Sequence, residues 1–196
     1  QFTRDGLVEV FSLDRVNKAP AGFDPQKLRA FQERHMLEVP TDEKVKLTLP
    51  YLEKAGLVDS PPPGTESKLG PIIEAAGDRI KVAGDVLDYA DFFLPDDRLP
   101  YDEKAFEKRL RKPADAVELL TKFKTQLAVA DPFDAANLEK LLHDFVEQEN
   151  IKIGQIIHAL RVAATGKSIG FGIFDILAIL GKERCLARID RAVGRV

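Results

Sequence analysis

The sequence predicts an all-α protein, and three observations carry that prediction. Apolar residues recur at the spacing of one helix face, most clearly over residues 134–148. Capping residues and glycines bracket these periodic segments. No segment alternates apolar and polar residues convincingly over more than four positions, so the sequence gives no strand signal.

The first helices are placed by their start and stop residues. Asp24 followed by Pro25 is typical of an N-cap and first helical position. Thr41, followed by acidic residues in the first turn, opens the next helix, and Gly56 ends it. Pro50 is expected to kink this second helix because it has no N–H to donate.

A proline-rich linker follows. Residues 59–66 (DSPPPGTE) have no apolar periodicity, which predicts a domain boundary. Residues 69–76 and 82–93 are expected to form the next two helices, and residues 94–101 (LPDDRLPY) a loop.

The second half reads as further helices. Asp102 opens an exposed helix, Pro113 a more apolar one, and residues 134–148 form the clearest amphipathic helix. Three glycines divide the remaining chain into three short helices: Gly166, Gly181 and Gly194.

Composition restricts the function. The 196 residues are 44% hydrophobic and 31% charged, and no apolar run approaches the ~20 residues of a membrane helix. One cysteine, Cys185, and three scattered histidines exclude an internal disulfide and a structural zinc site. We expect a monomer without a membrane or DNA partner, in the cytoplasm or an organelle matrix. Because the sequence begins at Gln1, we also expect a longer parent polypeptide.

Charge is unevenly distributed. Residues 151–196 carry eight Lys and Arg against three Asp and Glu, a net charge of +5, which leaves −8 on the first 150 residues. Four arginines repeat at helical spacing near the end: Arg184, Arg188, Arg191 and Arg195. This stripe fits either contacts with the phosphates of a nucleic acid or a solvated helix face. Arg161 and the glycine-rich aromatic turn 170–174 (GFGIF) offer a fork of donors and a ring, which favours a single-stranded RNA loop.

Catalytic motifs are weak. Residues 166–168 (GKS) match only the end of a phosphate-binding loop, because Arg161 stands where that motif needs glycine, so Gly166 is better interpreted as a helix C-cap. The carboxylate pairs and the histidines fit solvated or structural positions, and Cys185 fits a small core residue.

Segments near both ends resemble one family. Residues 160–166 (LRVAATG), 174–180 (FDILAIL) and 181–193 (GKERCLARIDRAV) resemble the C-terminal signature of bacterial-type glutamyl-tRNA synthetases. Residues 7–28 (LVEVFSLDRVNKAPAGFDPQKL) are similar to the segment that follows the family's catalytic core. The resemblance implies a tRNA stem-contact segment (1–58), the linker (59–66) and two helical anticodon-binding subdomains (67–132 and 133–196).

The resemblance also implies roles for individual residues. Arg161 and the turn containing Gly170, Phe171 and Ile173, with Phe174 beyond, are expected to hold the first anticodon base, and Arg79 the third. Gly170 and Phe171 depart from the small polar residue and proline usual in the family.

Contacts with the tRNA backbone are expected from residues at both ends of the chain. They are Arg15 and Lys18 near the N-terminus, and Arg184, Arg188 and Arg191 near the C-terminus. Residues 30–36 (AFQERHM) lack the family's W-x-N-G pattern.

The family's HIGH and KMSKS motifs do not occur in this sequence. The chain is therefore expected to bind glutamate tRNA without aminoacylating it and to need no cofactor, since ATP, magnesium and glutamate belong to the parent's catalytic domain. The alternatives are a helical protein-interaction scaffold whose basic tail is only solvated, and a free-standing regulatory relative.

Overall fold

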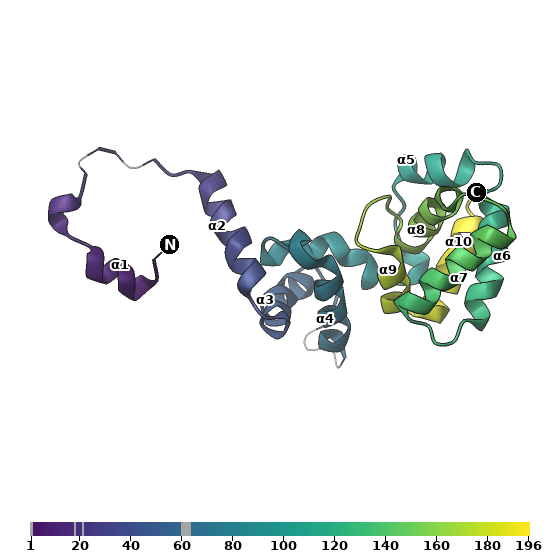
Figure 1. Cartoon of the computed structure of the whole chain (residues 1–196), viewed down its shortest axis with the longest axis horizontal. Coiled ribbons are helices and arrows are strands. Elements are labelled where there is room, and N and C mark those ends of the chain that lie inside the picture. The colour runs from purple at the N-terminus through teal and green to yellow at the C-terminus, as the bar shows by residue number, and fades with distance from the viewer. Residues whose placement is uncertain (1, 18, 21, 60–63) are drawn as a thin grey trace. The chain divides into compact units, whose positions relative to one another are not determined.

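The structure, a computed structural model, describes residues 2–17, 19–20, 22–59 and 64–196 (Figure 1). These residues contain helices and connecting segments but no strand, so the predicted all-α class is confirmed. The α-helices are α1 (Arg4–Val10), α2 (Pro25–Glu38), α3 (Thr41–Lys54), α4 (Thr65–Ala76), α5 (Glu103–Phe106), α6 (Ala116–Val129), α7 (Ala135–Gln148), α8 (Ile157–Thr165), α9 (Ile173–Leu180) and α10 (Lys182–Val193). The 3₁₀ segments are η1 (Leu13–Arg15), η2 (Gly77–Arg79), η3 (Ala83–Phe92), η4 (Asp96–Arg98) and η6 (Ile153–Gln155), and η5 (Glu107–Arg111) is a π-helix.

The chain forms two compact units, residues 1–31 and 32–196. This division differs from the predicted boundaries. Helix α3 packs against α4 and η3, so residues on both sides of the predicted linker belong to one unit. Helix α4 also begins at Thr65, inside the predicted linker, of which residues 60–63 lie outside the described residues.

Local chemistry explains several helix starts. The Asp24 carboxylate accepts hydrogen bonds from the amides of Gln26 and Lys27, which confirms it as an N-cap. Asp134 caps α7 in the same way through the amide of Asn137. Helix α3 continues through Pro50 to Lys54, so that proline does not end it.

Residues 82–93 differ from the predicted α-helix. They form the 3₁₀ segment η3, which Tyr89 interrupts with non-helical dihedral angles. Side chains from α10 and from the turn after α8 donate to carbonyl oxygens in and just after this segment, including those of Asp88, Asp91 and Phe92. These external donors satisfy carbonyls at the end of the segment that have no partner within it, and so hold the irregular geometry in place.

The predicted helix at Asp102 is also irregular. It consists of the short α5 followed by η5, and it is only partly exposed, since Ala105, Phe106 and Leu110 are buried. The predicted tail helices are confirmed as α8, α9 and α10, which are followed by Gly166, Gly181 and Gly194. Within the described residues, no helix has both the length and the apolar character needed to cross a bilayer.

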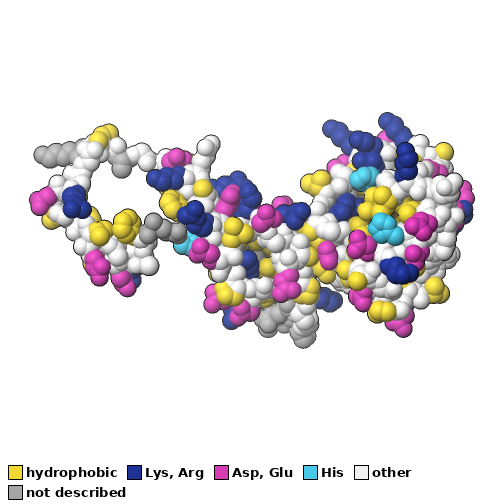
Figure 2. Space-filling view, viewed as in Figure 1, with side chains coloured by type: hydrophobic (Ala, Val, Ile, Leu, Met, Phe, Trp, Pro, Cys, Tyr) yellow, Lys and Arg dark blue, Asp and Glu magenta, His cyan; other side chains and the backbone are white. Residues whose placement is uncertain are grey.

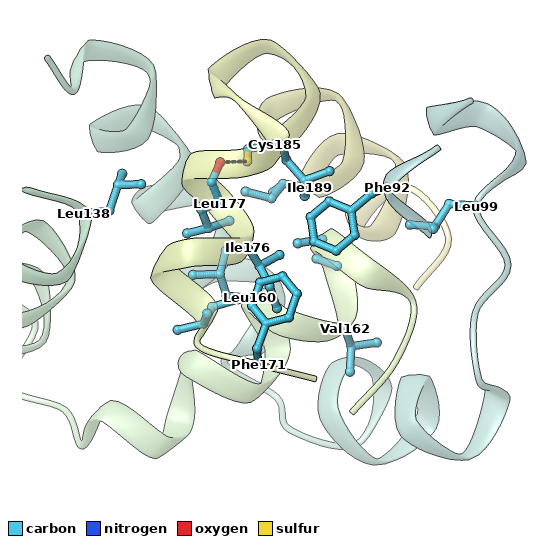
Figure 3. Packing of buried hydrophobic residues seen from close by; sticks show 14 of the residues in the cluster. Phe92, Leu99, Leu138, Leu160, Val162, Phe171, Ile176, Leu177, Cys185 and Ile189 are labelled. Carbon is cyan, nitrogen blue, oxygen red and sulfur yellow. Dashed lines mark hydrogen bonds between the residues drawn. The ribbon is translucent and has the colours of Figure 1, made fainter. Parts of the chain in front are cut away.

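The core of the second unit gathers buried apolar residues from α3 to α10. Figure 3 shows the rings of Phe92 and Phe171 facing each other beside Ile176 and Ile189. Cys185 is fully buried there and its Sγ contacts the Leu177 carbonyl, which confirms it as a core residue. Burial raises the pKa of Cys185 to about 12, so its thiol stays protonated near neutral pH.

Candidate nucleic-acid interface

Two of the predicted recognition arginines lie close together although they are far apart in the sequence. Arg79 ends η2 and is exposed, while Arg161 lies on α8 and is half-buried. Burial and the nearby positive charge of Arg79 both lower the pKa of Arg161. The two arginines therefore influence each other electrostatically.

Arg161 is held in place by the turn that follows its helix. Its Nη1 donates a hydrogen bond of 2.7 Å to the carbonyl oxygen of Phe171. A Cβ atom at Gly170 would lie 3.2 Å from that same nitrogen, so the glycine leaves room for the guanidinium. The expected association of Arg161 with Gly170 and the turn is therefore present, and Gly170 is exposed.

An open groove lies between η3 and the turn after α8. It has a volume of about 650 Å³. Its lining residues are Arg79, Leu87, Asp88, Tyr89, Ala90, Lys167, Ile169 and Gly170. Leu87 is 39% exposed and Ile169 79% exposed, so apolar surface and a cation meet in one groove. That combination suits an unpaired nucleotide base, which offers a flat apolar face and a polar edge.

The turn that forms one side of this groove is tied to the rest of the unit. Lys167 Nζ donates to the Asp88 carbonyl and to the buried Asp91 carboxylate, at 2.6 Å each. Gly166 has φ +75° and its amide donates to the Val162 carbonyl, which confirms the predicted C-cap. A Cβ at Gly166 would lie 2.0 Å from the carbonyl oxygen of Pro100, so only glycine fits.

The structure contradicts the expected contact of Phe171 with a base. Its side chain is 2% exposed and its ring packs against Tyr89 and Phe92, with ring centroids 5.5 and 5.6 Å apart. Ile173 is buried as well, and Phe174 is half-buried against the core. Phe171 therefore anchors the turn to the core, because the free energy of folding is more favourable with this large ring buried than with it exposed to water.

The expected phosphate-binding role of Arg188 is wrong. Its side chain is 0% exposed, which excludes the solvated-face interpretation as well. Nε donates to Asp96 Oδ1 at 2.6 Å, Nη1 to the Ala164 carbonyl at 2.5 Å and Nη2 to the Asp91 carbonyl at 2.7 Å. The arginine is thus fully engaged inside the fold, where its donors satisfy carbonyl groups that would otherwise be unpaired.

Arg184 and Arg191 are engaged in the same region. Arg184 donates to Asp96 and to the carbonyls of Phe92 and Leu94, at 2.7 to 3.0 Å. Arg191 donates to the Leu99 carbonyl at 2.6 Å. Arg191 is also half-buried, and its guanidinium lies 5.0 Å from the centroid of the Tyr101 ring. Both arginines are thus engaged within the fold, so their expected phosphate contacts are not supported.

Asp96 completes this internal network. Burial would raise the pKa of Asp96, but hydrogen bonds from Arg184 and Arg188 prevail and lower it. The carboxylate therefore stays ionised and binds both arginines. Residues 91–99 are thus tied to α10 by three arginines, which we call the α10 clamp: Arg184, Arg188 and Arg191.

The remaining predicted site residues are on the first unit. Arg15 is exposed in η1, a segment in which no residue is buried. Lys18 lies outside the described residues.

Sequence reasoning missed Leu87, Ile169 and the ion pair of Lys167. The one available signal was Ile169, an apolar residue in a turn that contains three glycines. Within the described residues, no group of three His, Cys, Asp or Glu side chains is placed to hold a metal ion.

Comparison with known proteins identifies the family and the fold. A family model described as "Anticodon binding domain" matches residues 43–193. The chain belongs to the anticodon-binding domain family. The matched range includes the groove lined by Arg79, the neighbouring Arg161, and all three arginines of the α10 clamp.

Individual relatives of this anticodon-binding domain are longer proteins. Glutamate–tRNA ligase of Herpetosiphon aurantiacus is 35% identical over 191 residues, which cover 97% of this chain and 38% of that protein. Glutamate–tRNA ligase of Moorella thermoacetica is 35% identical over 187 residues, covering 95% of this chain and 38% of the relative. The chain thus spans less than two-fifths of the length of these relatives and corresponds to their C-terminal part.

A solved structure shows the same fold. The crystal structure of a glutamate tRNA ligase from Elizabethkingia meningosepticum, in complex with its amino acid, superposes with a TM-score of 0.79 at 23% identity. The match covers 97% of this chain and 36% of that one. A second structure, from Elizabethkingia anophelis, gives a TM-score of 0.76 at 23% identity and covers the same share of each chain.

Proposed function

We propose that the chain binds the anticodon loop of glutamate tRNA and serves as the anticodon-recognition part of an enzyme that ligates glutamate to that tRNA. The observation that carries the proposal is the groove in which Arg79 meets exposed apolar side chains, with Arg161 held beside Gly170 of its lining. The family and the names of the relatives support it.

Each element of the groove has a distinct task in this proposal. Leu87 and Ile169 offer apolar surface on which an unstacked base packs. Arg161 donates to the edge of the first anticodon base and Arg79 to that of the third. The clamped turn keeps Arg161 in position, so its donors are fixed before the RNA arrives and little further ordering is needed.

The protein-interaction scaffold is not favoured. That alternative required a solvated basic tail, and the α10 arginines are instead bound to protein carbonyls and to Asp96. A monomer in the cytoplasm or an organelle matrix, with no DNA or membrane partner and no cofactor of its own, remains our prediction. So does the absence of glutamate-dependent ATP–pyrophosphate exchange by this chain, which has neither HIGH nor KMSKS motif.

Titration with two tRNA transcripts tests the proposal. We expect salt-dependent binding of the glutamate tRNA, and weaker binding of a tRNA with a different anticodon. Arg79→Ala should weaken the cognate complex by roughly 1 to 3 kcal/mol, the range for a good contact with a base edge. Arg98→Ala is the matched control, because Arg98 is also an exposed arginine at the end of a 3₁₀ turn but lines a different pocket. Equal binding of both tRNAs by all three proteins would contradict the proposal.

A further inference from the structure

The π-helix η5 carries two cations that have no acidic partner. Lys108 is exposed and Arg109 half-exposed, and the structure gives neither side chain an ion pair within the described residues. Helix η5 packs against α8, the helix that carries Arg161. In Figure 2, Lys and Arg side chains gather around a His on this face of the second unit.

Another cation on the same π-helix behaves differently. Arg111 lies 3.6 Å from Glu103 and 3.7 Å from Glu107, and its guanidinium lies 5.0 Å from the centroid of the Phe106 ring. On η5, the charge of Arg111 is therefore neutralised by acidic neighbours, whereas the charges of Lys108 and Arg109 are not neutralised within the described residues. Lys108 and Arg109 repel each other, so leaving them without acidic partners does not stabilise the fold.

His158 and Arg161 are one turn apart on α8, the helix against which η5 packs. Burial lowers the pKa of His158, and the charges of Arg109, Arg161 and Lys108 lower it further. Two of these cations come from η5 and one from the same helix as His158. Arg161 in turn lies near Arg79, so positive charge continues from η5 to the groove.

We propose that Lys108, Arg109 and His158 form a phosphate-binding ledge that holds the sugar–phosphate backbone of the RNA strand whose bases enter the groove at Arg161. The inference rests on the proposed function and assigns it a backbone-binding surface on η5 and α8, in place of the stripe on α10. Lys108 and Arg109 supply charge to the phosphates, and the uncharged His158 ring supplies an N–H donor.

Charge complementarity favours this occupant over an acidic protein. The ledge lies on η5 and α8, and the turn that follows α8 lines the groove proposed for a base. A nucleotide strand presents a base and a phosphate together at every residue. A phosphate on the ledge would remove the mutual repulsion of the cations, so the cluster is stabilised only when the strand is bound.

A pair of double variants tests the ledge in the 196-residue chain. The ledge variant is Lys108→Ala with Arg109→Ala. The control is Lys104→Ala with Arg111→Ala, which removes the same charge from α5 and η5. Each is titrated with the glutamate tRNA transcript over a range of salt concentrations, and circular dichroism confirms that each is folded.

The ledge variant should bind more weakly and lower the slope of log affinity against log salt by about one unit for each lost phosphate contact. The loss should be equal for transcripts with different anticodon bases, since phosphates carry no sequence information. The control should keep the slope of the unmodified chain. Equal slopes for both variants, with the unmodified chain still binding, would overturn the ledge alone. No salt-dependent binding by the unmodified chain would overturn the proposed function and the ledge with it.

Discussion

The arginines of α10 and the arginines of the groove are the same residue type in two opposite environments. Arg188 is fully enclosed and donates to Asp96 and to the carbonyls of Ala164 and Asp91. Arg79 is exposed and makes one hydrogen bond of 3.3 Å, to the Ala76 carbonyl. The difference lies in the neighbouring backbone, since irregular segments beside α10 expose carbonyls that need donors.

This comparison shows that net charge along a sequence does not locate a binding surface. The +5 charge of residues 151–196 includes three arginines whose donors are used within the fold. The open cations lie partly outside that segment, on η2 and η5. A polyanion responds to accessible charge, and accessibility is a property of packing.

The largest effect is expected at Phe171. Its truncation to alanine should lower the free energy of unfolding by about 3 to 5 kcal/mol, because it leaves a cavity beside Tyr89 and Phe92. Ile169→Ala, two residues earlier in the same turn, is the control and should change stability by less than about 0.5 kcal/mol. Urea unfolding measures both. Similar small losses would mean that Phe171 is at the surface and available to a base.

Arg188→Ala should have the next largest effect. Removing it leaves Asp96 with one partner fewer and two carbonyls without their donor, which should cost about 3 kcal/mol of unfolding free energy. Arg98→Ala, an exposed arginine of η4, should cost less than about 0.5 kcal/mol. Urea unfolding of the two variants compares them. A stable Arg188→Ala variant with weakened tRNA binding would support the original stripe and refute the clamp.

The comparison also explains which expectations from the sequence held. Helix starts at Asp24 and Asp134 follow from short-range capping, and the tail helices end at glycines, so neighbouring residues alone predict them. Segment η3 could not be predicted in this way. Its apolar pattern is helical, but its carbonyls are satisfied by side chains from α10, a partner distant in sequence.

The residues of the candidate site were likewise predicted only in part. The resemblance placed Arg161 beside Gly170 and its turn, and the structure brings them together. Phe171 and Arg188 failed because helical spacing and residue type do not state which side of a turn or helix is buried. Lys108 and Arg109 gave no sequence signal, because paired and unpaired cations on one helix look alike until their acidic partners are placed.

A smaller effect concerns pH. His158 should titrate below its ordinary pKa of 6.5, and Arg109→Ala should raise that pKa, whereas Arg111→Ala should leave it unchanged. Because the folded state resists protonation, the unfolded chain binds the proton first, so stability is present above pH 6.5 and is lost as pH falls through the lower folded pKa. Nuclear magnetic resonance of the imidazole ring follows the titration. An unshifted pKa, insensitive to Arg109→Ala, would place the cations of η5 away from α8.

The central claim is that Arg79 in the groove and Arg161 beside it, and not the arginines of α10, distinguish anticodon bases. Arg161→Lys tests it most directly, because lysine keeps the charge but loses the fixed fork of donors. We predict a loss of roughly 1 to 3 kcal/mol with the cognate tRNA and much less with transcripts changed at the first anticodon base. Titration against transcripts carrying each of the four bases at that position measures the selectivity. An equal loss for all four bases would contradict the claim and assign Arg161 to the turn that it holds through the Phe171 carbonyl.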